Sequence, residues 1–88
     1  MEIPNDLLMK REIKIGAKYK HFKGGVYEIV AVAKDSEDTS RELVVYKQLY
    51  ETPEHPIGTV WIREKNNFLE EISREGKIFL RFEEIKIN

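Results

Sequence analysis

The chain has 88 residues and a mass of 10.4 kDa, which is enough for one small domain. Its 15 Lys and Arg against 16 Asp and Glu give a net charge of −1, whereas proteins that coat nucleic acid are usually strongly basic. Cysteine is absent, which excludes disulfides, thiolate zinc ligands and cysteine nucleophiles. Because no apolar run suits a membrane helix and residues 1–6 do not resemble a signal peptide, we expect a cytoplasmic protein without a membrane partner.

Residues 1–15 are predicted to form a helical arm ahead of the main domain. Asn5 or Asp6 can cap one or two helical turns that run to Arg11. A helix this short needs another element to pack against. Gly16 then interrupts the chain, and we place the boundary of the arm there.

The next segment predicts two strands around a glycine turn. Residues 18–22 alternate polar and aromatic side chains, which is typical of a half-buried strand. Gly24 and Gly25 favour a tight turn, because glycine accepts positive φ. Residues 26–33 are rich in β-branched and aromatic side chains and predict a second strand, followed by a polar loop over residues 34–41.

Residues 42–50 predict a third strand, in which Tyr46 and Gln48 share one face because side chains alternate along a strand. Two prolines and a glycine make residues 51–59 a loop, and residues 60–63 form a short strand.

The last third of the chain predicts one helical turn and one more strand. Asn66 or Asn67 can cap the helical turn, and Gly76 is typical of a helix C-terminus. Residues 78–82 form the last strand, and residues 83–88 are a tail.

Five short strands with little helix indicate a mainly β protein, and we expect a small five-stranded SH3-like barrel over residues 16–82. Short helical segments would flank it at the N-terminus and precede the last strand. Closure of the barrel would remove exposed strand edges, which otherwise promote aggregation.

Several motifs follow one another in a recognisable order. They are Tyr-Lys-His-Phe-Lys-Gly-Gly at residues 19–25, Leu-Val-Val-Tyr at residues 43–46 and Trp-Ile-Arg at residues 61–63. In this order they resemble a bacterial family of small domains, the domain-of-unknown-function family sixteen fifty-three. The resemblance extends from about Gly16 to Phe82 and implies no assigned activity. The chain departs from the family pattern at Asp35, where a basic residue or histidine is usual, and at Glu64, where proline is usual.

An aromatic and arginine strand face is the first candidate site. Trp61 and Arg63 lie two residues apart and share a face. If their strand pairs with that of Tyr46, these three side chains form a patch that His21 and Thr39 can border. Aromatic rings supply flat contact area, and the arginine fork binds carboxylate or phosphate. The alternatives are that Trp61 is a core side chain, that Arg63 pairs with a carboxylate, and that His21 makes a structural hydrogen bond.

A basic segment is the second candidate. Residues 10–34 hold seven positive and two negative charges, a net of +5. Lys18, Lys20 and Lys23 alternate there with aromatic residues, a pattern that suits single-stranded nucleic acid. The alternative is a solvated lysine face balanced by acidic loops.

We therefore expect a binding or adaptor module that recognises a small anionic ligand or a peptide through the strand face, with single-stranded nucleic-acid binding as the alternative. An enzyme with His21 or Glu37 as acid–base is less favoured, because no catalytic motif supports it. The spacing of His21 and His55 suits no metal site, and no cofactor is expected. We expect a monomer or a weak homodimer, with residues 7–9 and 85–87 as candidate contacts.

Overall fold

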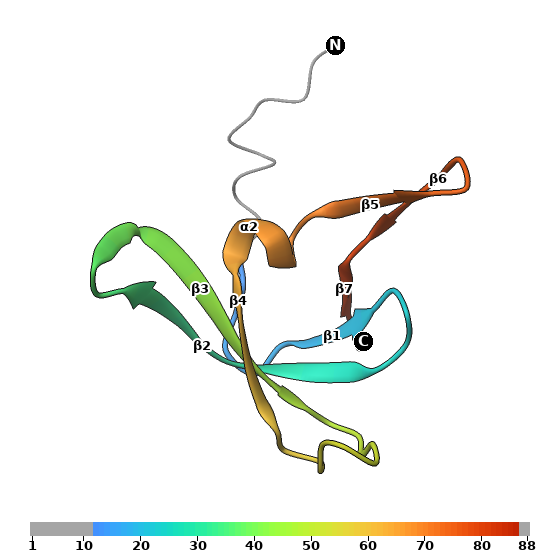
Figure 1. Cartoon of the computed structure of the whole chain (residues 1–88), viewed down its shortest axis with the longest axis horizontal. Coiled ribbons are helices and arrows are strands. Elements are labelled where there is room, and N and C mark those ends of the chain that lie inside the picture. Colours follow the sequence, from blue (N-terminus) through green and yellow to red (C-terminus); the bar gives the residue numbers. More distant parts are fainter. Residues whose placement is uncertain (1–11, 87–88) are drawn as a thin grey trace.

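The computed structural model describes residues 12–86 and shows a mainly β domain (Figure 1). Its elements in chain order are β1 (Lys18–His21), β2 (Val26–Asp35), β3 (Asp38–Gln48), β4 (Val60–Glu64), α2 (Lys65–Phe68), β5 (Glu71–Arg74), β6 (Lys77–Leu80) and β7 (Phe82–Ile85). Five strands form an antiparallel sheet in the order β4-β3-β2-β1-β7, and β5 pairs with β6 in a separate hairpin. The helical turns expected over residues 5–11 lie outside the described residues, and residues 12–15 contain no helix.

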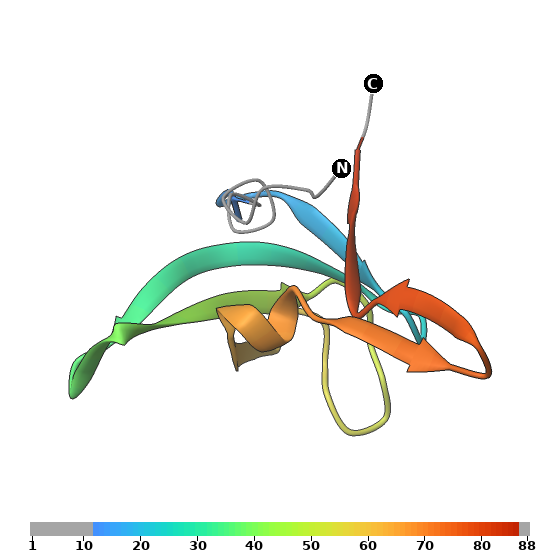
Figure 2. The same ribbon diagram turned by 90° about the horizontal axis from the view of Figure 1, so that it is seen from above.

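The five-stranded sheet is curved but open (Figure 2). Strands β4 and β7 stand at its two edges, and no pairing joins them within residues 12–86. The closed SH3-like barrel expected from the sequence is therefore not observed. The physical reason lies at Arg81, where the expected last strand divides: β6 pairs with β5, and β7 turns away to pair with β1. Residues 83–85, expected as a tail, thus belong to the edge strand β7.

The β2–β3 hairpin is longer than the sequence predicts. A polar loop was expected over residues 34–41, but β2 runs to Asp35 and β3 begins at Asp38. The backbone N–H of Glu37 donates to Asp35 Oδ1 at 2.8 Å, which closes the two-residue turn. Side chains on both faces of this distal part meet solvent, so the strands need no hydrophobic alternation and give no periodic signal.

Gly76 belongs to a hairpin turn and not to a helix end. The helical turn ends at Phe68, well before that glycine. Glu75 and Gly76 connect β5 to β6 with φ values of 53° and 75°. Two consecutive positive φ values match the turn that best joins twisted antiparallel strands. The prediction that Gly76 caps a helix was wrong. Glycine is common both after the C-terminus of a helix and in hairpin turns, because it accepts positive φ.

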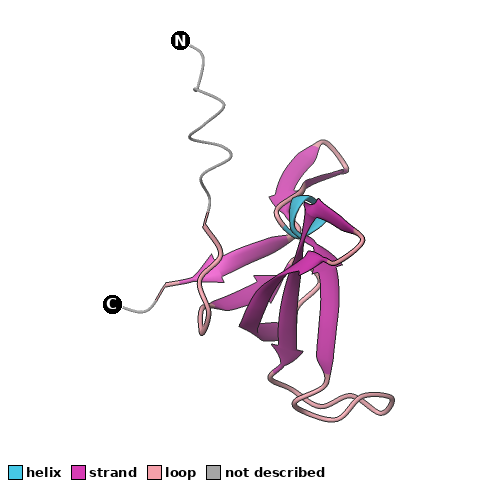
Figure 3. Ribbon diagram, turned by 90° about the vertical axis from the view of Figure 1, so that its left-hand side faces the viewer, coloured by secondary structure: helices cyan, strands magenta, loops and turns pink. Residues whose placement is uncertain are grey.

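The core lies on the inner face of the sheet, which we define as the face covered by α2. The helix follows β4 and leads into the β5–β6 hairpin (Figure 3). It buries Phe68, whose ring stacks on Phe82 of β7 with centroids 4.1 Å apart. Tyr19 and Tyr46 contact Phe68 edge-on, at 5.1 and 5.4 Å. Among the described residues, Ile29 and Val44 are the other buried apolar side chains.

Candidate functional site

Strand pairing places the predicted aromatic and arginine residues on one face. In the register of β3 and β4, Tyr46 is opposite Trp61 and Val44 is opposite Arg63. Directly opposite residues point to the same side of a sheet, so these side chains all lie on the inner face. Arg63 Nε donates to the Tyr46 hydroxyl at 3.2 Å, and Trp61 Nε1 donates to Gln48 Oε1 at 3.2 Å.

The guanidinium of Arg63 is held by neutral groups. Besides the Tyr46 hydroxyl, it donates from Nη1 to Asn67 Oδ1 at 2.6 Å, and its Cζ lies 5.5 Å from the centre of the Phe82 ring. No carboxylate of residues 12–86 forms an ion pair with it. The carboxylate partner considered from the sequence is thus not among the described residues. A half-buried cation with only neutral acceptors keeps its attraction for an anion.

His21 lies on the same side, opposite Phe82 in the pairing of β1 with β7, and the two ring centroids are 4.9 Å apart. Its Nδ1 accepts the backbone N–H of Lys23 at 3.1 Å, so the proton of the neutral ring is on Nε2. Burial lowers the pKa of His21 below its usual value, and the positive charges of Arg63, Arg81 and Lys23 lower it further. His21 therefore offers an N–H donor at neutral pH. We call His21, Tyr46, Arg63 and Phe82 the arginine face.

Trp61 lies beside the arginine face at the margin of the core. It is half-buried and packs against the core without being part of its centre. Its ring meets that of His55 edge-on at 4.8 Å. Gln48, which accepts the indole N–H, also donates from Nε2 to the carbonyls of Tyr50 and His55, at 2.9 and 3.0 Å. Trp61 and Gln48 together fix the loop between β3 and β4.

Two further tyrosines extend the arginine face. The hydroxyls of Tyr27 and Tyr50 share a hydrogen bond of 2.6 Å, and the Tyr27 ring meets Tyr46 edge-on at 5.3 Å. Burial, followed by the hydrogen bond to Tyr50, raises the pKa of Tyr27 far above its usual range. Tyr27 therefore remains neutral. Sequence reasoning missed the link between Tyr27 and Tyr50, because it depends on strand register.

Asn67 is another contact of Arg63 that the sequence did not reveal. It was considered a helix cap, yet its side chain accepts from Arg63 across the junction of β4 and α2. The spacing of four residues is a weak signal, because it identifies a neighbour only once the helical turn is known.

Thr39 does not join the arginine face. It lies near the distal end of the β2–β3 hairpin, seven residues before Tyr46 in the same strand. That separation corresponds to about 23 Å along an extended strand. Glu37 lies in the turn beyond it, so the structure does not bring either residue to His21. Within residues 12–86, no group of three or more His, Asp or Glu side chains is arranged to hold a metal ion.

The lysines of the basic segment differ in their ion pairs. Lys18 lies 3.8 Å from Glu28, which also pairs with Lys47 at 3.7 Å. Lys20 and Lys23 lie at the other end of β1 and its turn, and neither forms an ion pair with a described residue. Lys18 is therefore paired with a carboxylate, whereas the other two lysines are not paired with a described one.

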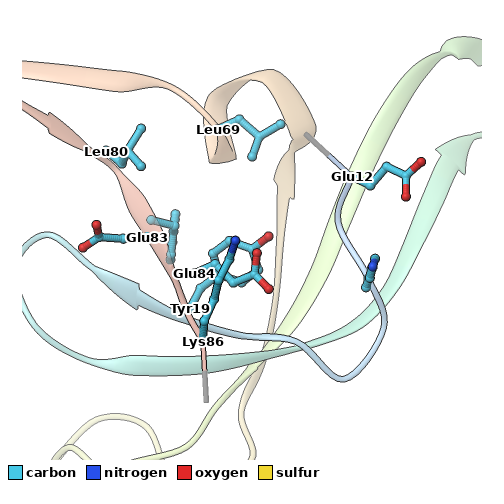
Figure 4. Close-up of a pocket in the computed structure, with 9 residues that line it drawn as sticks. Glu12, Tyr19, Leu69, Leu80, Glu83, Glu84 and Lys86 are labelled. Carbon is cyan, nitrogen blue, oxygen red and sulfur yellow. The ribbon is translucent and has the colours of Figure 1, made fainter. Parts of the chain in front are cut away.

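A hollow of about 720 Å³ lies between β1, β7 and the end of α2 and shares Phe82 with the arginine face (Figure 4). Its lining residues are Glu12, Lys14, Tyr19, Leu69, Leu80, Phe82, Glu83, Glu84 and Lys86. Its three carboxylates outnumber its two lysines, so the net charge of this hollow disfavours an anion more than the surroundings of Arg63 do.

Residues 12–86 thus form a small mainly β domain: an antiparallel sheet, an added hairpin and one short helix, with an arginine and aromatic inner face. The chain belongs to the family of proteins of unknown function DUF1653, whose model matches residues 17–84. This match confirms the resemblance drawn from the motifs. No curated protein and no solved structure gives a match. In the part of the chain that the structure describes, no helix has the length and apolarity to cross a membrane.

Proposed function

We propose that this protein is a binding module that recognises the anionic group of a small ligand or peptide at the arginine face. The observation that carries the proposal is the half-buried guanidinium of Arg63, oriented by Tyr46 and Asn67 and without a carboxylate partner in residues 12–86. Small β-barrels commonly bind ligands through one strand face, and the curved open sheet presents a comparable face.

Recognition follows from the donors that remain. A guanidinium has five N–H groups, and the described hydrogen bonds of Arg63 use two of its nitrogens, Nε and Nη1. Nη2 is available for a carboxylate or phosphate oxygen. His21 adds Nε2–H from β1, and both side chains contact the Phe82 ring. Because neighbouring groups already orient the two donors, binding an anion orders few additional side-chain torsions.

The protonation of His21 favours binding over catalysis. A histidine acts as a general base through an unprotonated ring nitrogen that faces the substrate. Here Nδ1 is engaged by the Lys23 amide, so the outward Nε2 carries the proton. The arginine face is therefore a set of donors, which suits the recognition of an anion without a chemical step.

The test is the change in thermal unfolding temperature on adding inorganic phosphate, citrate or a short acidic peptide. The wild-type chain should be stabilised by at least one of these probes, because a ligand that binds only the folded state raises its stability. Arg63→Ala should lose this stabilisation, and Arg63→Lys should retain part of it, because it keeps the charge without the planar fork.

The matched control is Lys34→Ala. Lys34 is an exposed cation near the distal end of β2, and no described carboxylate forms an ion pair with it. Its loss changes the net charge as Arg63→Ala does, and ligand stabilisation should remain. Equal stabilisation of Arg63→Ala and the wild type would contradict the proposal.

A further inference from the structure

A second surface lies where the turn after β1 meets the β5–β6 hairpin, and we propose that it binds single-stranded nucleic acid. We call it the hairpin surface and define it by its exposed or half-buried cations and aromatic rings: Lys20, Phe22, Lys23, Arg74, Lys77 and Phe79. Arg63 does not line this surface, although His21 of the arginine face lines one of its hollows, so the proposal rests on residues other than Arg63.

Phe22 brings together two cations from separate elements. Lys23 Nζ and Arg74 Cζ each lie 5.7 Å from the centre of its ring. Cation–π attraction holds both charges beside the ring, so they lose less freedom when they meet a phosphate. Arg74 belongs to β5, more than 50 residues later in the chain, and therefore the cluster exists only in the folded protein.

Two hollows open beside these rings. One of about 400 Å³ reaches Lys20 and Ile78, and one of about 410 Å³ reaches Arg74 and Lys77. Phe22 and Phe79 line both of them. The Phe79 side chain is well exposed, at 41%. An exposed phenyl ring beside an open hollow offers the flat face on which an unpaired base stacks.

The charge of the hairpin surface complements a polyanion. Among described residues, none of its four cations forms an ion pair. Glu75 and Glu83 also line the hollows, so the surface has four positive and two negative charges, a net of +2. The whole chain has a net charge of −1, so positive charge is concentrated here. Phosphates that contact such cations release counterions, which favours binding at low salt.

A single strand matches this surface better than the other polyanions. Each nucleotide presents a phosphate and an exposed base face, which correspond to the cations and to Phe79. A duplex hides its base faces by stacking, and an acidic peptide supplies charge without a planar group. The nucleic-acid site inferred from the sequence therefore changes in composition. Lys20 and Lys23 belong to the hairpin surface, whereas Lys18 pairs with Glu28. The β5–β6 hairpin supplies the other cations and Phe79.

The test is fluorescence anisotropy with the full chain and a labelled oligothymidylate of about 10 nucleotides, at several KCl concentrations. The logarithm of the association constant should fall linearly with the logarithm of salt concentration, by about 0.7 for each phosphate contact. The double variant Lys23→Gln/Arg74→Gln should reduce this slope by about 1.4. Phe79→Ala should weaken binding at least about fivefold, and so should Phe79→Leu, which retains apolar volume.

One control separates this surface from the rest of the molecule. Lys34→Gln removes an exposed cation from the distal part of β2, and this variant should bind the oligonucleotide as the wild type does. Circular dichroism should show that each variant is folded.

Four results would overturn the proposal: no binding at low salt, equal weakening by Lys34→Gln, tighter binding of a duplex of the same length, or binding only of a poly-glutamate peptide.

Discussion

Arg63 and Tyr46 are diagonal neighbours on adjacent strands, and the Nε–H of Arg63 donates to the Tyr46 hydroxyl at 3.2 Å. Their direct partners in the ladder are Val44 and Trp61, so the hydrogen bond runs diagonally across the inner face. Asn67 holds the Nη1 side of the same guanidinium from α2. Two elements, β3 and α2, thus orient the cation that β4 carries, and Tyr46 is a positioning residue for Arg63.

Tyr46→Phe tests this positioning. The variant keeps the buried ring and removes only the hydroxyl, so we expect a loss of about 0.5–1.5 kcal/mol in the free energy of unfolding. Anion binding should weaken less than in Arg63→Ala, because Asn67 still holds the guanidinium. Urea denaturation measures stability, and calorimetric titration with the anion measures affinity. Unchanged affinity in Tyr46→Phe would mean that the tyrosine does not orient Arg63.

Gly25 and Gly24 form a matched pair for substitution. A Cβ on Gly25, at φ +80°, would lie 2.6 Å from the Tyr50 hydroxyl oxygen. A Cβ on Gly24, at φ +105°, would meet nothing within 4 Å. Both alanine variants carry the strain of positive φ, on the order of 1–3 kcal/mol, and Gly25→Ala also displaces Tyr50. Urea denaturation should therefore show Gly25→Ala to be the less stable variant; the reverse order would argue against close contact with Tyr50.

Gln48→Leu should loosen the loop between β3 and β4. Gln48 is 2% exposed; its side chain donates hydrogen bonds to two backbone carbonyls and accepts one from the Trp61 indole. Leucine leaves these groups without their partner, which should lower the free energy of unfolding by roughly 1–3 kcal/mol. Tryptophan emission should shift to the red as water reaches the indole. An unchanged emission maximum with unchanged stability would show that the three bonds contribute little.

The pKa of His21 predicts a pH dependence of stability. Burial, and then the charges of Arg63, Arg81 and Lys23, place this pKa below the ordinary value of 6.5. Between the folded pKa and 6.5 the unfolded chain binds more protons, so stability rises with pH in this window. The contribution is fully present above 6.5 and is lost as pH falls through the folded pKa.

Urea midpoints at a series of pH values from 7 downward measure this effect. His21→Gln should flatten the part of the profile just below pH 6.5, whereas His55→Gln should retain it. A profile that is the same in His21→Gln and the wild type would assign the effect to other groups.

Phe68→Ala tests the attachment of α2 and the hairpin to the sheet. Phe68 is fully buried and stacks on Phe82, so its truncation should cost about 3–5 kcal/mol of unfolding free energy. Ile62→Ala is the control, because Ile62 is 62% exposed on an edge strand and its loss should change stability by less than about 0.5 kcal/mol. Similar denaturation midpoints for the two variants would contradict a core centred on Phe68.

The sequence by itself determined the features that depend on neighbouring residues. The two-residue alternation of strands predicted that Tyr46 shares a face with Gln48, and Trp61 with Arg63, and the structure shows both pairs on the inner face. Glycine at positions 24 and 25 identified the β1–β2 turn, where both have positive φ. The motifs along the chain also identified the family. Each of these patterns extends over only a few residues, so it can be recognised without knowledge of the fold.

Only the tertiary structure decided which segments pair and what each side chain meets. Arg81 divides the expected last strand, so the sheet stays open, and the polar residues around Asp35 form a long hairpin in place of a loop. Asn67 reaches Arg63, and Arg74 reaches Phe22. These outcomes depend on which distant backbone groups find hydrogen-bond partners and which apolar faces are buried together. That choice is made by the free energy of the whole fold, and no local pattern contains it.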